Sequence, residues 1–165
     1  MSDQFLVKIF EHNNWANWCI LQACAVLNDE QLDASPQSVT KGTIRATLTH
    51  LVSSQQSYLR TLTRPLEERL DPVIVEFVQL QESARMSGEG LLALAKGEQK
   101  PLSSRIQTRD GYMVEPWVVM LQAINHATEH REQIKSMLSD LGITPPDIDG
   151  WDFGLATNAL VAISK

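Results

Sequence analysis

Cysteine and positive charge are both scarce in this 165-residue chain. Cys19 and Cys24 are its only cysteines, and they lie five positions apart within one expected helix. Side chains at that spacing point in different directions, so we expect two reduced, packed thiols rather than a disulfide or a zinc pair. Lys and Arg number 14 against 20 Asp and Glu, which gives a net charge of −6. Such a chain repels a phosphate backbone, so we expect no nucleic-acid partner.

The chain also lacks long apolar runs. None approaches the roughly 20 residues that a membrane span needs, and the first residues have neither the basic region nor the apolar stretch of a signal peptide. We therefore expect no membrane association and a cytoplasmic location. Hydrophobic residues make up 43% of the chain and charged residues 21%, without a break in composition. This is ordinary for a globular protein and predicts one domain over residues 1–165.

Four stretches repeat apolar residues every three or four positions, which is the spacing of an amphipathic helix. They cover residues 5–27, 43–64, 71–96 and 116–141. Asp71 and Pro72 are expected to open the third, because Asp caps free backbone N–H groups and Pro suits a first turn. Pro116 opens the fourth in the same way, and Gly142 ends it.

The segments between these helices are also distinctive. Residues 28–42 are rich in Asp, Ser, Pro and Gly, which indicates a long connection. Residues 105–108 and 112–114 flank Asp110 and Gly111, which predicts a small hairpin before the last long helix. The tail from Asp149 is expected to form one more short helix. Together these features predict an all-α protein, an antiparallel four-helix bundle with a short hairpin before helix four.

The helix over 116–141 carries two of the four histidines, His126 and His130. Residues four apart lie one turn above another on the same face, so both imidazoles can bind one ion. Gln133, one turn beyond His130, is expected to line this site. Glu129 and Glu132 are expected to belong to a charged, solvent-facing side.

His50 lies at the edge of the apolar stripe of the helix over 43–64, in a column of Thr and Ser hydroxyls. A third imidazole here would complete a three-nitrogen site with open positions, as in catalytic rather than structural metal centres. From spacing alone the alternative stays open that these histidines only hydrogen-bond to neighbours. We interpret His12 as a packed core histidine rather than a fourth ligand or a base. Trp15 and Trp18 are likewise expected in the core rather than in a substrate pocket.

A second apolar face runs along the helix over 116–141. Val119, Ala123 and Met137 share the histidine face, whereas Trp117, Leu121, Ile124, Ile134 and Leu138 line the other. A helix that is apolar on two sides must be covered on two sides, which one bundle core does not easily achieve. We therefore expect a homodimer.

Several short motifs carry a family resemblance across nearly the whole chain. They are Asn14-Trp15-Ala16-Asn17, Thr49-His50-Leu51-Val52, the Asp110-Gly111 turn, and His126 through Ile134 followed by Leu138, Gly142 and Pro145-Pro146. In this order they resemble the DinB family, also called DinB/YfiT-like metalloenzymes. The chain departs from the family pattern at Glu132, where glycine is frequent. It also has Gln55 and Tyr58 where an acidic residue and a tryptophan are frequent.

The resemblance implies that His50, His126 and His130 bind a divalent metal ion, nickel or zinc, with iron or manganese as alternatives. It also implies a thiol S-transferase-like enzyme that uses a low-molecular-weight thiol. Two other functions stay open: a metal-dependent hydrolase that activates water, and a non-enzymatic dimeric stress-response or interaction module. Similar scaffolds host different reactions, so the substrate is left undetermined.

Overall fold

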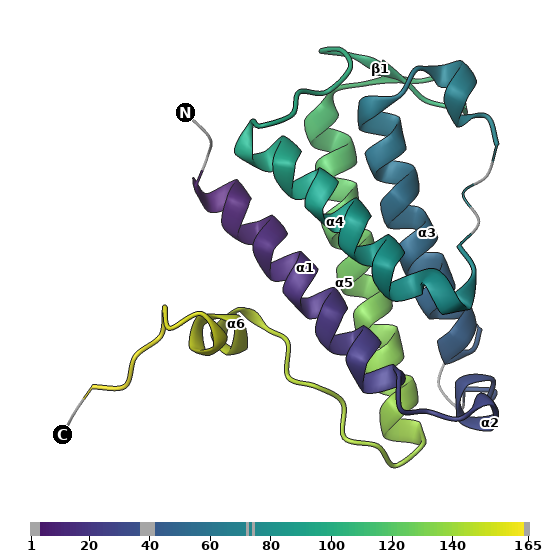
Figure 1. Ribbon diagram of the computed structural model, residues 1–165, viewed down its shortest axis with the longest axis vertical. Coiled ribbons are helices and arrows are strands. Elements are labelled where there is room, and N and C mark those ends of the chain that lie inside the picture. Colours follow the sequence, from purple (N-terminus) through teal and green to yellow (C-terminus); the bar gives the residue numbers. More distant parts are fainter. Residues whose placement is uncertain (1–3, 37–41, 72, 74, 164–165) are drawn as a thin grey trace.

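The computed structural model describes every residue except 1–3, 37–41, 72, 74 and 164–165, and the described part of the chain is mostly helical (Figure 1). Its long helices are α1 (Gln4–Cys24), α3 (Ile44–Thr63), α4 (Leu80–Lys96) and α5 (Pro116–Asp140), and its short ones are α2 (Asp29–Leu32) and α6 (Gly150–Ala156). β1 (Ile106–Gln107) and β2 (Met113–Val114) form an antiparallel pair in which Ile106 lies opposite Val114. The predicted helical class is confirmed.

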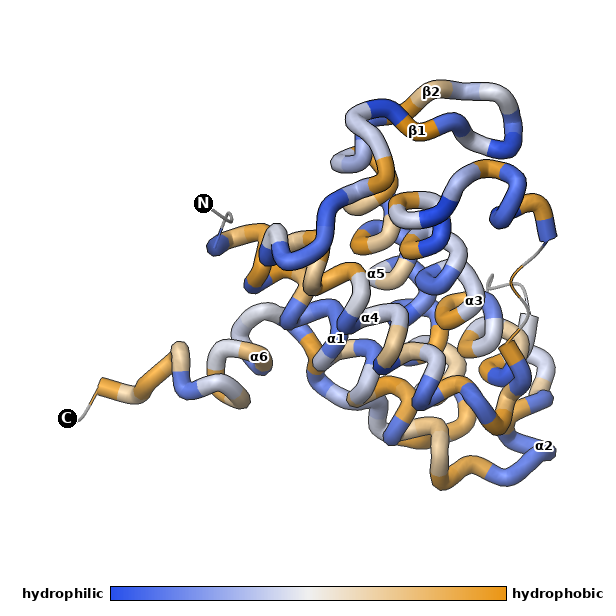
Figure 2. Tube along the Cα trace, turned by 45° about the horizontal axis from the view of Figure 1, so that its top comes forward, coloured by the Kyte–Doolittle hydropathy of each residue, from blue (hydrophilic) through white to orange (hydrophobic). Residues whose placement is uncertain are grey.

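Each long helix packs against two others. α1 contacts α4 and α5, and α3 contacts the same two helices. Figure 1 shows the β1–β2 hairpin beyond one end of these helices and α2 near the other, with α6 beside α1. Figure 2 shows apolar and polar residues alternating along the helical tubes, as expected when each helix buries one face.

Several helix boundaries confirm local signals in the sequence. The Thr43 side chain accepts a hydrogen bond from the backbone of Ala46 and caps α3, and Pro116 is the first residue of α5. Gly142 follows α5 with φ = 72°, a left-handed conformation that glycine adopts without a steric penalty. Asp149 caps α6 by accepting hydrogen bonds from two backbone N–H groups.

The predicted start of the third long helix is wrong. α4 begins at Leu80, and Asp71 is exposed, whereas Pro72 lies outside the described residues. Val75 is buried and Val73 and Phe77 pack partly against the core. Alternate positions up to the start of the 3₁₀ helix Phe77–Gln79 therefore face inward, which is the period of extended chain rather than of an α-helix. The four-residue step from Val73 to Phe77 fits both periods, and the β-branched residues between them favour the extended one.

The connection over 28–42 contains one helical turn that the sequence prediction omitted. Asn28 and Gln31 hydrogen-bond to each other's backbone N–H groups and cap α2 at 2.9 and 3.1 Å. Residues 37–41 of this connection lie outside the described residues.

Cys19 and Cys24 are free thiols, partly and fully buried, and burial raises the pKa of Cys24 to about 12. Burial also raises the pKa of Cys19, and the prediction of two packed thiols without a disulfide is confirmed.

Two apolar clusters lie along the long helices. The cluster toward the hairpin includes Phe10, Leu62, Leu91, Ile106 and Met120. The cluster toward α2 includes Ile20, Leu48, Leu51, Ile134 and Leu138. Between them in sequence, on all four long helices, lies a set of buried polar side chains that we call the central polar layer: Asn13, Asn17, Gln55, Ser87 and Arg131. The core is thus apolar at both ends and polar in the middle.

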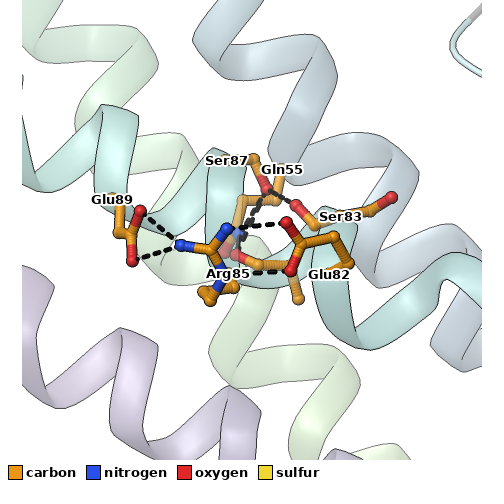
Figure 3. Close-up of polar contacts among 7 residues, drawn as sticks. Gln55, Glu82, Ser83, Arg85, Ser87 and Glu89 are labelled. Atoms are coloured by element: carbon orange, nitrogen blue, oxygen red, sulfur yellow. Dashed lines mark hydrogen bonds and ion pairs between the residues drawn. The ribbon is translucent and has the colours of Figure 1, made fainter.

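Hydrogen bonds connect the central polar layer across the four helices. Nη1 of Arg131 donates to Oδ1 of Asn13 and to Oδ1 of Asn17, each at 2.7 Å. Nδ2 of Asn17 donates to Oε1 of Gln55 at 2.8 Å. Nε2 of Gln55 donates in turn to Oγ of Ser87 at 2.8 Å, the contact drawn in Figure 3. Buried polar groups with partners of this kind fix the relative position of helices.

The second apolar face of α5 is covered along half of its length only. Ile134 and Leu138 are fully buried in the core of the same chain, whereas Trp117 is 60% and Leu121 52% exposed. The chain itself therefore covers the C-terminal half of this α5 face, and the homodimer stays a prediction that concerns the N-terminal half of the face.

Within the described residues, no helix has both the length and the apolar character needed to cross a bilayer.

Candidate metal centre

Helices α3 and α5 bring His50, His126 and His130 together. Nε2 of His126 lies 3.0 Å from Nε2 of His50 and 3.1 Å from Nε2 of His130. His126 and His130 are one turn apart on α5, and the packing of α3 against α5 supplies His50 from 76 positions away. The three ligand atoms offered by these residues lie within 4.8 Å of one another. Among the described residues, this is the one group of three such side chains that can hold a metal ion.

The spacing of the nitrogen atoms fits a single ion. Imidazole nitrogens bind zinc at about 2.0–2.1 Å, so two nitrogens on the same ion lie roughly 3 Å apart. Two of the three Nε2 separations, at 3.0 and 3.1 Å, have that value, and the ligand atoms of all three residues lie within 4.8 Å of one another. Three neutral imidazoles suit several first-row divalent ions, so the donor set limits the metal class without selecting one metal.

Gln133 orients one of the three imidazoles. Its Oε1 lies 2.7 Å from Nδ1 of His130 and can only accept a hydrogen, so Nδ1 carries the proton. The lone pair of His130 then lies on Nε2, the nitrogen that faces His126. Neighbours of this kind fix the tautomer and ring orientation of metal-binding histidines. The sequence prediction that Gln133 lines the site is confirmed.

The three rings lie at the protein surface. His50 is exposed, and His126 and His130 are partly buried. Burial, then the charges of His130 and His50, lowers the pKa of His126 to about 4. Burial, then the charge of His130, also lowers the pKa of His50. Both rings are therefore neutral near pH 7, the state in which imidazole binds a metal.

Tyr58 and Gln122 extend the site along the same two helices. The ring of Tyr58 meets that of His126 edge-on, with centroids 5.6 Å apart. Burial raises the pKa of Tyr58. A hydrogen bond with Gln122, which lies one turn before His126 on α5, opposes this rise more weakly. On the other side, His50, His130, Gln133 and Thr47 line a cavity of about 210 Å³. The column of hydroxyls predicted beside His50 is thus represented there by Thr47.

Four residues weighed in the sequence lie outside the histidine cluster. Nε2 of His12 lies 2.8 Å from the carbonyl oxygen of Ile148, and its ring contacts Phe153. His12 is therefore a packed structural histidine, as predicted. Gln55 belongs to the central polar layer, and Glu132 is exposed and pairs with a lysine at 3.3 Å. Trp18 is 47% exposed, so its predicted place in the core is wrong.

Comparisons with known proteins agree with this architecture. The fold resembles the crystal structure of a proposed member of the DinB family from Exiguobacterium sibiricum 255-15, with a TM-score of 0.64. The two proteins are 20% identical, and the alignment covers 86% of this chain and 94% of the other. No curated protein matches this sequence. The sequence model of the DinB family matches residues 1–159. This chain therefore belongs to the DinB family.

Proposed function

We propose that this protein is a divalent-metal-dependent enzyme of thiol S-transferase type, built on an antiparallel four-helix bundle. The observation that carries this proposal is the convergence of His50, His126 and His130, whose ligand atoms lie within 4.8 Å of one another, with Nε2 of His126 at 3.0 and 3.1 Å from the other two. Structural zinc sites are closed by four protein ligands, whereas catalytic sites keep a position open. A cluster of three imidazoles at the surface belongs to the second kind.

The residues around the cluster prepare the ligands. Gln133 holds His130 in the tautomer that has its lone pair on Nε2, and Tyr58 packs edge-on against the ring of His126. When bound, a divalent ion supplies Lewis acidity that lowers the pKa of a coordinated thiol or water. In thiol transfer, the sulfur forms a bond to an electrophilic carbon, the leaving group departs with its electron pair, and the thiol proton passes to solvent.

The composition of the cluster favours a thiol over water as the nucleophile. A thiol has a pKa of about 8.5 and needs little help to ionise at neutral pH. Metal-dependent hydrolases commonly add a carboxylate that takes a proton from water. The group formed by the described residues contains three histidines and no Asp, Glu or Cys. This supports S-transfer and makes hydrolysis the alternative that the assays must test.

Metal content measured by inductively coupled plasma mass spectrometry is the first test. We expect near-stoichiometric divalent metal in untagged wild-type protein, and its loss in the double variant His126→Ala/His130→Ala. His12→Ala is the matched control, because it removes the one histidine outside the cluster and should retain the metal. A wild-type protein that binds no metal even after reconstitution would contradict the proposal.

A thiol-transfer assay on the loaded protein tests the reaction. Conjugation of a low-molecular-weight thiol to an aryl halide should depend on the metal, fall by at least about 100-fold in His50→Ala and stay unchanged in His12→Ala. Ester hydrolysis that requires the metal but no thiol would instead establish the hydrolase alternative. Transfer that is unchanged in His50→Ala would rule out this site.

A further inference from the structure

A second cavity adjoins the histidine cluster between α3, α5 and the hairpin. Its volume is about 310 Å³, within the size range of small-molecule sites. Tyr58 lines this cavity and also contacts the ring of His126, and Gln122 lines it one turn before His126. Val114, Val118 and Val119 form an apolar wall. A molecule in this cavity therefore lies beside the proposed metal centre.

Arg69 lines the cavity as a nearly buried cation. It is 4% exposed and ends the 3₁₀ turn Leu66–Arg69. Its Nη2 donates to the carbonyl oxygen of Gln107 at 2.8 Å, and its Nε donates to that of Pro65 at 3.3 Å. Among the described residues, Nη1 has no hydrogen-bond acceptor and no carboxylate lies within 4.0 Å of the guanidinium. A buried guanidinium without a carboxylate is energetically unfavourable.

Arg109 brings a second guanidinium to the same cavity. Its Nη2 donates to the carbonyl oxygen of Asp71 at 2.6 Å, and it too has no carboxylate partner within the described part of the chain. Burial, then the charge of Arg109, lowers the pKa of Arg69, and Arg60 acts in the same direction against the opposing effect of Glu67. The two guanidiniums therefore repel each other, and this repulsion makes the charged form of Arg69 less favourable.

Two other arginines of this acidic protein are paired with carboxylates. Arg85 pairs with Glu82 at 2.6 Å and with Glu89 at 2.8 Å, as Figure 3 shows. Arg45 pairs with Asp29 and Asp33 in the same way. Acidic side chains outnumber basic ones, so carboxylates were not in short supply. Two guanidiniums without a carboxylate at one cavity form a local positive field that attracts an anion.

We propose that this cavity binds a small organic anion, whose carboxylate is held by Arg69 and Arg109 and whose apolar part packs against Val114, Val118 and Val119. A planar guanidinium matches the two oxygens of a carboxylate. The apolar wall favours an organic molecule over a free inorganic ion. The further role of this molecule as the electrophilic substrate rests on the proposed function, whereas anion binding itself does not require the metal.

Titrations of metal-free protein followed by ¹H–¹⁵N NMR test the anion site. Benzoate should shift the amide signals of Val114 and Val118 to saturation, and benzamide, which is uncharged, should bind at least about tenfold more weakly. Arg109→Gln should weaken benzoate binding by about tenfold. Arg105→Gln is the matched control: it removes the same charge from an exposed position beside β1 that does not line the cavity, and it should bind benzoate like wild type.

Arg69→Gln extends the test to the buried cation. We expect it to weaken benzoate binding at least as much as Arg109→Gln, with a circular dichroism spectrum like that of wild type. If Arg69→Gln fails to fold, the comparison of Arg109→Gln with Arg105→Gln still decides. Equal affinity for benzoate and benzamide, or equal weakening by Arg109→Gln and Arg105→Gln, would overturn the proposal. Displacement of benzoate by inorganic phosphate at equal concentration would overturn the assignment to a carboxylate.

Two further samples separate this proposal from the proposed function. Benzoate should bind His126→Ala as it binds wild type, because the arginines and not the histidines hold the carboxylate. If the wild-type protein takes up no metal on reconstitution but still binds benzoate, the anion site is supported and the proposed function fails. Benzoate binding to metal-loaded protein alone would show that the ion holds the carboxylate, which would overturn the assignment to Arg69 and Arg109.

Discussion

His130 and Arg131 are neighbours on α5 but belong to two very different polar clusters. Arg131 lies in the central polar layer, where it is 3% exposed and donates to oxygens of Asn13, Asn17 and Thr128. His130 lies at the surface with its Nε2 facing another Nε2. The members of the first cluster are hydrogen-bonded to one another across the four helices. The second brings three imidazole nitrogens together at the surface, so it suits a metal ion.

The two clusters also treat charge differently. Burial lowers the pKa of Arg131 to about 10, yet the guanidinium stays charged near pH 7 because amide oxygens surround it. Burial lowers the pKa of His126 to about 4, and that ring stays neutral. One cluster thus holds a permanent cation within the fold, and the other keeps its side chains uncharged for binding. Variants that alter each cluster alone should separate stability from metal affinity.

Arg131→Leu should have the largest effect, and on stability alone. It leaves Oδ1 of Asn13 and Oδ1 of Asn17 without their donor in the core, and two such losses should cost about 3 kcal/mol of the free energy of unfolding. Urea denaturation of metal-free protein measures this loss. Arg105→Leu, which removes an exposed arginine, should change stability by less than about 0.5 kcal/mol. Wild-type stability in Arg131→Leu would show that the central polar layer does not support the fold.

Gln133→Leu should have an intermediate effect, on metal affinity. Without the acceptor for Nδ1, His130 no longer holds its Nε2 lone pair toward the site, and affinity should fall by about 10- to 100-fold. Isothermal titration calorimetry with zinc or nickel measures this change. Glu132→Gln, an exposed neighbour, should bind metal like wild type. A Gln133→Leu protein of unchanged affinity would contradict the orienting role of this amide.

The pH dependence of stability should show the smallest effect. The unfolded chain protonates His126 near pH 6.5, whereas the folded protein does so only near about pH 4. Between these values the unfolded state binds more protons, so the stability of metal-free protein falls as the pH falls. We expect a loss on the order of 1 kcal/mol between about pH 6.5 and pH 5, reduced by the partial exposure of the ring.

Thermal or urea unfolding at a series of pH values measures this slope. His126→Ala should make it shallower, because the histidine whose pKa falls to about 4 is gone, whereas His50, whose pKa burial also lowers, remains. Arg131→Leu should leave the slope unchanged, because a guanidinium stays charged throughout this range. An identical slope in His126→Ala and wild type would show that other groups set the pH dependence.

Much of the fold was predictable where a local rule acts alone. Thr43, Pro116, Gly142 and Asp149 mark helix ends at the positions where the structure has them, since capping depends on a few adjacent residues. The segment before α4 was not predictable in this way. Val73 and Phe77 fit a helical and an extended period equally well, and only packing against the core selects a segment without α-helix that leads into the 3₁₀ helix Phe77–Gln79.

The candidate site was predicted to a similar extent. The spacing of His126 and His130 gave their shared face, and the same rule placed Gln133 beside them. Tyr58 was noted in the sequence, but its contact with His126 was not foreseen, and neither Arg69 nor Arg109 was noted. Arg69 and Arg109 meet at the cavity from a 3₁₀ turn and from the hairpin, which lie 40 positions apart in the sequence. No periodic pattern connects such segments.

The sequence by itself determined the helical class, most helix boundaries and the pairing of His126 with His130, because each depends on residues within one or two helical turns. Only the tertiary structure decided that His50 completes the group at 3.0 Å, that Arg131 is buried among amides, and that Arg69 and Arg109 share a cavity. Those distances depend on how α3, α5 and the hairpin pack against one another. That packing is set by the whole core and not by any local segment.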